Sequence, residues 1–168
     1  MKIAIIGTGN VGGALATKWS KAGHTLLLGV QNTQDFKGKH LLDNPNTSAH
    51  SVADAVNAAE VILIATPATA AVEVAKSLGG TSGKTIIDAM NIINGRGPKD
   101  FDNTADAILK NTASNDVVKC FNTTGFNNMI DPIYNETAVD LFTCGDSIKG
   151  KEIAIKLAKD AWFAECYD

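Results

Sequence analysis

The fold is decided by the opening stretch Lys2-Ile3-Ala4-Ile5-Ile6, which is followed directly by Gly7-Thr8-Gly9-Asn10-Val11-Gly12. Four apolar residues after Lys2 stop at a glycine, which is typical of a short buried strand. From Val11, apolar residues recur at helical spacing as far as Ala22, and Gly23 follows as a helix C-cap. A strand, a glycine-rich turn and a helix are therefore predicted to open the chain.

The glycines of this turn fit the pattern GxGxxG. Gly7 permits a tight turn, Gly9 has no Cβ and lets a pyrophosphate approach the backbone, and Gly12 lets the helix lie close to the sheet. The free N–H groups and the positive end of the helix dipole attract an anion. A glycine turn that serves packing alone has the same letters, but the position between strand and helix favours a dinucleotide site. Its predicted residues are Gly7, Thr8, Gly9, Asn10, Val11 and Gly12.

Predicted strands and helices alternate along the rest of the chain. Strand-sized apolar runs cover 24–30, 48–50, 61–65, 84–88, 117–121 and 141–143, with a last strand within 162–166. Helices are expected over 51–58, 68–78, 104–109 and 148–161. Continuous apolar strands are the pattern of a parallel sheet that is covered on both faces. We predict an α/β fold, with a doubly wound, mostly parallel Rossmann sheet and helices on both faces, forming a single NAD(P)-binding domain over 1–168.

Length, composition and charge limit the classes of function. The chain has 168 residues, 45% hydrophobic and 20% charged, as in one globular domain. Its net charge is −3, and only Arg96 among 15 basic residues is an arginine, so the basic stripe of a nucleic-acid binder is missing. No apolar run approaches the ~20 residues that span a bilayer, and the N-terminal run is too short for a signal peptide. We expect a cytoplasmic protein without nucleic-acid or membrane partners.

Neither the cysteines nor the histidines show the spacing of a metal site. The three cysteines are odd in number and form no CxxC motif, and they are interpreted as small buried apolar residues. The histidines form no HxH or HExxH motif. The residues concerned are Cys120, Cys144, Cys166, His24, His40 and His50.

The end of the second predicted strand bears on the choice of dinucleotide. Proteins that bind NAD usually place a carboxylate there, about 20 residues beyond the glycines. The stretch Gly29-Val30-Gln31-Asn32-Thr33 has none, and Asp35 comes several residues later. The absence of a carboxylate permits a 2′-phosphate, so we predict NADP(H) in preference to NAD(H). The available donors are Thr8, Gln31, Asn32, Thr33, Lys37 and Lys39.

Three polar segments follow buried strands and are expected to meet at the carboxyl edge of the sheet. They are Thr66-Pro67, Asp88-Ala89-Met90-Asn91 and Phe121-Asn122-Thr123-Thr124-Gly125. Each is also compatible with ordinary loop capping, but together they predict a pocket for nicotinamide and substrate. No catalytic acid or base is evident, and Asp88 is expected to be a solvated strand end. Hydride transfer does not require such a group, because the cofactor supplies the chemistry.

Five segments carry a resemblance to a known family, and they are Met1 to Ala16, Lys21-Ala22-Gly23-His24 with Leu28-Gly29, Ala65-Thr66-Pro67, Ile87 to Asn91, and Lys119 to Gly125. Together they resemble the family of NADP oxidoreductases that use coenzyme F-420, a deazaflavin. The oxidoreductase domains of membrane ferric reductases are similar, and pyrroline-carboxylate reductases are more distantly similar. The resemblance covers nearly the whole chain, and the segment around Phe121-Asn122-Thr123 is its more specific part.

This resemblance implies NADP(H) binding, hydride transfer to or from a small-molecule acceptor such as a deazaflavin or flavin, and a homodimer. It implies that Thr8 and the residues after Gly29 face the adenosine 2′-phosphate. The family commonly has a Ser-Arg pair after that glycine, where this chain has Val30-Gln31. The resemblance further implies that the middle of the cofactor and the nicotinamide are lined by Ala65, Thr66 and Pro67, and by Ala89, Met90 and Asn122, respectively.

Three functions follow as hypotheses. The first is an NADP(H)-dependent oxidoreductase with a deazaflavin, a flavin or another small molecule as acceptor. The second is a non-catalytic dinucleotide-binding module that senses redox state, which the missing acid or base favours. The third is a reductase of small imines or keto acids, which would need a proton donor.

Overall fold

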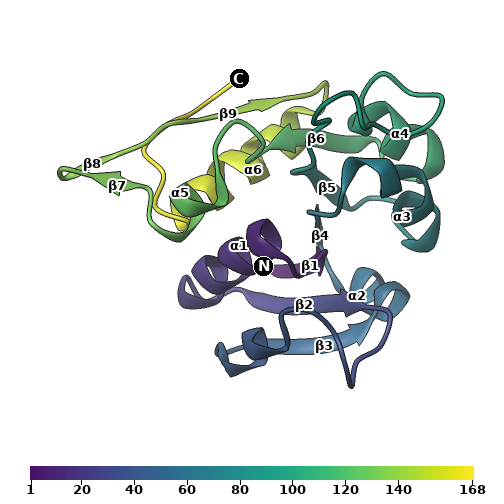
Figure 1. Cartoon of the computed structure of the whole chain (residues 1–168), viewed down its shortest axis with the longest axis horizontal. Coiled ribbons are helices and arrows are strands. Elements are labelled where there is room, and N and C mark those ends of the chain that lie inside the picture. Colours follow the sequence, from purple (N-terminus) through teal and green to yellow (C-terminus); the bar gives the residue numbers. More distant parts are fainter.

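The computed structural model describes all residues, 1–168, and its centre is an eight-stranded sheet. The strands lie in the order β10-β9-β6-β5-β4-β1-β2-β3 (Figure 1). β1 to β6 are parallel to one another, whereas β9 is antiparallel to β6 and parallel to β10. This confirms the predicted mostly parallel sheet. The strands are β1 (Lys2–Ile6), β2 (Thr25–Val30), β3 (Thr47–Ser51), β4 (Val61–Ile64), β5 (Thr85–Asp88), β6 (Asp116–Cys120), β9 (Leu141–Cys144) and β10 (Cys166–Tyr167).

Helices cover both faces of this sheet (Figure 1). One face holds α1 (Asn10–Lys21), α5 (Phe126–Ile130) and α6 (Ile148–Asp160), and the other holds α2 (Val52–Ala58), α3 (Ala71–Ser77) and α4 (Thr104–Asn111). Alternate residues of β1 enter the two cores, because successive side chains of a strand point to opposite faces. Ile3 and Ile5 pack with α1 and α6, and Ala4 and Ile6 pack with α2, α3 and α4.

Side-chain caps begin most of the longer helices. In α2, α4 and α6 the N-cap oxygen accepts a hydrogen bond from the backbone N–H three residues later, the arrangement that satisfies a free donor. The pairs are Ser51 with Asp54 (3.2 Å), Asn103 with Asp106 (2.8 Å) and Ser147 with Gly150 (2.9 Å). α1 has no such cap. Its N-terminus is therefore available to a ligand.

The structure departs from the predicted elements in short segments. The expected helix over 68–78 starts as a 3₁₀ turn at Ala68–Ala70, and α3 follows. Three short segments were not predicted, namely α5, a 3₁₀ turn at Lys39–Asp43, and the hairpin of β7 (Ile133–Tyr134) and β8 (Thr137–Ala138). The last strand begins later than predicted, because Trp162 has a left-handed φ of 74° and interrupts extended backbone.

The cysteines differ in their surroundings. Cys120 and Cys166 are buried with their Sγ atoms 4.0 Å apart, as predicted for small core residues. Cys144 is exposed, which contradicts that interpretation for the third cysteine, because its side chain points away from the core on strand β9. None of the helices has the length and apolar content that crossing a membrane requires.

Candidate functional site at the carboxyl edge of the sheet

Two glycines hold the turn after β1 close to its neighbours. Gly7 has a φ of 103°, and a Cβ there would lie 2.5 Å from the carbonyl oxygen of Ala65. A Cβ on Gly12 would lie 1.9 Å from the carbonyl oxygen of Gly7. The end of β4, the turn and the first turn of α1 are therefore in direct contact, and both positions require glycine.

Gly9 is the open member of the motif. A Cβ on Gly9 would meet nothing within 4 Å, so the space above it is free. Gly9 is also the N-cap of the 12-residue helix α1, which has no side-chain cap and no acidic residue in its first turn. Its free N–H groups and its dipole favour an anion at this point. The turn thus fits a pyrophosphate.

A cavity of about 370 Å³ lies beside the turn, at the end of β2. It is lined by Thr8, Gly29, Gln31, Asn32, Asp35 and Phe36, among others. Gly29 lies close to β1, since a Cβ there would be 2.5 Å from Cδ1 of Ile6. Of the predicted donors for a 2′-phosphate, Thr8, Gln31 and Asn32 line this cavity, and Thr33, Lys37 and Lys39 do not.

Internal hydrogen bonds fix the loop after β2. The Thr8 hydroxyl donates to the carbonyl oxygen of Lys37, which ties the loop to the glycine turn. The Lys39 ammonium donates to the carbonyl oxygen of Gln34 at 2.8 Å, and the Gln34 N–H donates to Oδ1 of Asn32 at 2.9 Å. These hydrogen bonds therefore hold in place the loop that forms one wall of the cavity.

A second cavity, of about 240 Å³, lies on the other side of the turn. It brings together the six residues that were expected along the middle of the cofactor and at the nicotinamide, which are Ala65, Thr66, Pro67, Ala89, Met90 and Asn122. Val11 of the glycine motif also lines it. No lining side chain is ionisable, so the cavity offers a ligand apolar, amide and hydroxyl groups only.

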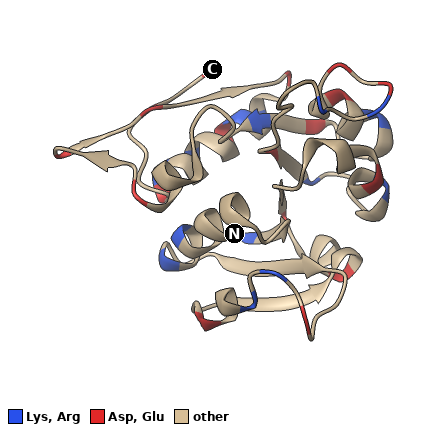
Figure 2. Ribbon diagram, viewed as in Figure 1, with Lys and Arg blue, Asp and Glu red and all other residues tan.

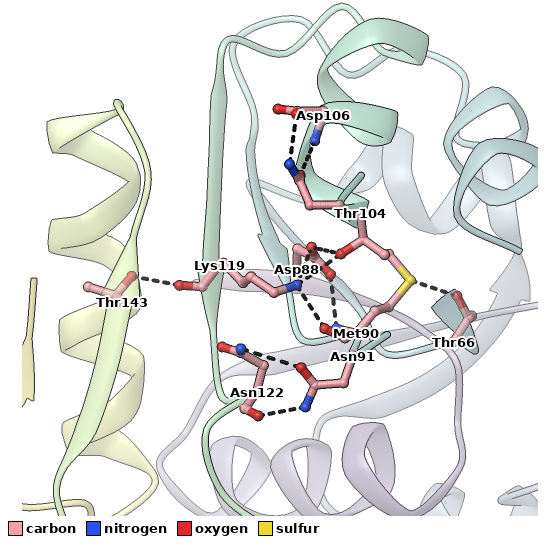
Figure 3. A network of polar contacts seen from close by, with 10 residues as sticks. Thr66, Asp88, Met90, Asn91, Thr104, Asp106, Lys119, Asn122 and Thr143 are labelled. Carbon is pink, nitrogen blue, oxygen red and sulfur yellow. Dashed lines mark hydrogen bonds and ion pairs between the residues drawn. The ribbon is translucent and has the colours of Figure 1, made fainter. Parts of the chain in front are cut away.

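A buried ion pair supports the rim of this second cavity (Figure 3). The Asp88 carboxylate is fully buried and accepts from the Met90 N–H at 2.9 Å, from the Lys119 ammonium at 2.8 Å and from the Thr104 hydroxyl. Lys119 also donates to the carbonyl oxygen of Met90 at 2.7 Å and to Oγ1 of Thr104 at 2.9 Å. The expectation of a solvated Asp88 is wrong, because Lys119 of the neighbouring strand and Thr104 of α4 turn the carboxylate inward.

Weaker contacts join the three strand ends to one another. The Thr66 hydroxyl lies 3.4 Å from Sδ of Met90 (Figure 3). The Asn91 side-chain amide donates to the carbonyl oxygen of Asn122 at 2.6 Å. Lys119 was not assigned a role from the sequence, and Asn91 was predicted only as part of the polar segment after β5. The signal for both was their place at the ends of adjacent strands.

A third cavity, of about 620 Å³, runs along α1 from the glycine turn. Gly9 and Asn10 of the glycine turn line this cavity, and so does Lys37. Lys18 lies in its wall, with Nζ 3.4 Å from the ring centre of Trp162. Burial lowers the pKa of the Lys18 ammonium, and the nearby Asp131 acts in the opposite direction.

Comparisons with known proteins agree with this architecture. A protein from Arthrobacter sp. FB24, provisionally named an F420-dependent NADP-reductase, has 24% identity and a TM-score of 0.84, over 100% of this chain and 84% of that one. A hypothetical protein, SMa0349 from Sinorhizobium meliloti, has 22% identity and a TM-score of 0.83, over 99% and 84%. A reductive aminase from Aspergillus terreus, solved with NADPH and ethyl-5-oxohexanoate, has 20% identity and a TM-score of 0.69, over 99% and 54%. These likenesses establish the fold.

The family is established by sequence. A search of curated proteins found no match to this chain. The sequence profile of the family described as NADP oxidoreductase, coenzyme F420-dependent, matches residues 2–92, which is more than half of the 168 residues and includes the glycine turn, Gly29 and Thr66-Pro67. The chain belongs to this family of coenzyme F420-dependent NADP oxidoreductases.

Proposed function

We propose that this protein binds NADP(H) across the carboxyl edge of its sheet and transfers hydride between the nicotinamide and a small acceptor of the deazaflavin or flavin type. The observation that carries the proposal is the uncapped N-terminus of α1 beneath the open backbone of Gly9. The family of the chain supports NADP(H), and the NADPH in the Aspergillus reductive aminase supports it by analogy of fold.

Three parts of the site bind three parts of the cofactor. The cavity beside β2 takes the adenosine, the backbone of Gly9 and Asn10 takes the pyrophosphate, and the cavity framed by Pro67, Met90 and Asn122 takes the nicotinamide. The nicotinamide, when bound, supplies the redox chemistry. The residues of the chain orient the ring and exclude water around it.

The character of the second cavity supports the choice of acceptor. Its lining offers amide and hydroxyl groups and no ionisable side chain. A deazaflavin or flavin needs no proton donor from such a cavity, because a ring nitrogen of the acceptor itself takes up or releases the proton that accompanies the hydride. An imine or keto acid needs a proton donor from the protein, and the cavity offers no ionisable one.

Gly9→Val tests the binding mode. The valine side chain would occupy the space where the pyrophosphate must lie, and its Cβ would meet no protein atom within 4 Å, so the fold should persist. We expect NADPH affinity, measured by calorimetry, to fall at least ~100-fold, with a melting temperature unchanged within about 2 °C. Gly9→Ala should give an intermediate loss. Unchanged NADPH affinity in the valine variant would contradict the proposal.

One observation favours a second candidate function. Because no ionisable side chain lines the nicotinamide cavity, a protein that binds the dinucleotide and reports redox state without turnover also fits. NADPH oxidation followed at 340 nm, with flavin mononucleotide and with a deazaflavin as acceptors, separates the two. Turnover supports the oxidoreductase, and tight binding without turnover supports the sensor.

A further inference from the structure

The cavity beside β2 has a charge that does not suit a 2′-phosphate. Its lining contains no lysine, arginine or histidine, and Asp35 is its only charged residue. Asp35 is exposed and forms no ion pair. The glycine turn fits the pyrophosphate of the family's cofactor. The cavity beside β2, in contrast, does not provide the cation that usually binds the 2′-phosphate of NADP.

The nearby cations are directed elsewhere. Lys37 lines the cavity along α1 and does not line the cavity beside β2. The Lys39 ammonium is held by the carbonyl oxygen of Gln34 at 2.8 Å. Acidic and basic positions occupy separate parts of the loop after β2 (Figure 2). Arg96, the single arginine, lies in the loop after β5.

The remaining polar groups do not discriminate between the two coenzymes. The side-chain amides of Gln31 and Asn32 can donate to a phosphate oxygen and can equally well accept from or donate to a ribose hydroxyl. Asp35 differs, because a carboxylate accepts a hydrogen bond from a 2′-hydroxyl and repels a phosphate, which carries roughly two negative charges at neutral pH.

We propose that Asp35 determines the coenzyme selectivity of this chain and reduces its preference for NADPH, so that NADH binds with comparable affinity. This inference rests on the proposed dinucleotide site and adds to it the residue that recognises the ribose. It also accounts for the Val30-Gln31 pair, which supplies no arginine at the end of β2. A carboxylate that comes later in the loop takes the place usually held by one at the strand end.

Calorimetric titration of NADPH and NADH into the wild type, Asp35→Asn and Asp43→Asn tests the inference. Asp43 is an exposed carboxylate at the end of the same loop and lines neither cavity of the cofactor site, so it is a matched control for net charge. We expect the two dissociation constants of the wild type to lie within about tenfold. Asp35→Asn should tighten NADPH about tenfold and leave NADH unchanged or weaker, and Asp43→Asn should change neither. Because the repulsion is electrostatic and exposed, 0.5 M salt should reduce the effect of Asp35→Asn.

The possible results separate the inference from the function on which it rests. Wild-type binding of NADPH at least 100-fold tighter than NADH would overturn the inference and leave the proposed function intact. An unchanged NADPH affinity in Asp35→Asn would overturn the role of Asp35. Failure of both coenzymes to bind the wild type would overturn the proposed function as well.

Discussion

Gly7, Gly9 and Gly12 belong to one motif but are constrained in three different ways. Gly7 needs a positive φ and a close approach to β4, Gly12 needs space beside the carbonyl oxygen of Gly7, and Gly9 needs only open space for a ligand. Substitutions at Gly12 should therefore act on folding, and substitutions at Gly9 should act on binding.

Gly12→Ala should destabilise the protein by about 3 kcal/mol, because the new methyl group would lie 1.9 Å from the carbonyl oxygen of Gly7 and the helix must shift. Gly13→Ala is the matched control in the next helical position. Its methyl group would lie 3.6 Å from Cδ1 of Leu41, an ordinary contact, and should stabilise α1 by up to about 1 kcal/mol. Urea denaturation measures both. Equal stability of the two variants would contradict this account of the turn.

The sequence pattern predicted which side chains meet at the strand ends, but it did not predict their hydrogen-bond and ion-pair partners. The position of Thr66, Met90 and Asn122 follows from parallel strands that end at one edge. The burial of Asp88 does not follow, because it depends on a lysine 31 residues later in the chain, on the adjacent strand. Side-chain pairing across strands depends on register, which the local pattern does not determine.

The ends of β5 and β6 are held together by the pair of Asp88 and Lys119, whose side chains are 0% and 20% exposed. Lys119→Met should cost about 3–5 kcal/mol, because it leaves a buried carboxylate without its cation. Combining it with Asp88→Asn should recover much of that loss, since no unpaired charge then remains. Lys149→Met is the control, because that lysine is 53% exposed in its pair with Asp116 and should contribute less than about 1 kcal/mol. No difference between the two lysine variants in chemical denaturation would rule out a structural role for the buried pair.

The long apolar strands and the periodic helices were predictable, and the short segments were not. β1, β2, β4 and β5 are fully or almost fully buried, so their composition alone indicates strands of a covered parallel sheet. The five residues of α5 and the two-residue strands β7 and β8 are too short to show a period. Contacts with α1 and within the hairpin hold these segments.

Contacts between distant parts of the chain join α6 to the N-terminal half of the molecule. The Trp19 indole N–H donates to the carbonyl oxygen of Leu157 at 2.9 Å, and His24 lies 2.9 Å from the carboxylate of Asp160. The N-terminal ammonium of Met1 is 3.1 Å from Nδ1 of the same histidine. The start of β2 and the end of α6 therefore depend on one another, and acid should weaken their contact.

Asp160 makes the stability of the whole molecule depend on pH. Burial raises the pKa of this carboxyl, but hydrogen bonds from His24 and Lys156 outweigh burial and hold the pKa below its ordinary value. A lowered folded pKa stabilises the protein above the ordinary pKa of about 3.9, and this stabilisation is lost as the pH falls through the folded value.

Asp160→Asn should therefore cost about 1.5 kcal/mol at pH 7. The difference from the wild type should shrink below pH 4, where the protonated carboxyl resembles the amide. Glu152→Gln, an exposed change on the same helix, should show neither effect. Urea unfolding at several pH values measures the difference, and a constant gap between wild type and Asp160→Asn down to pH 2 would contradict the charge-dependent contact.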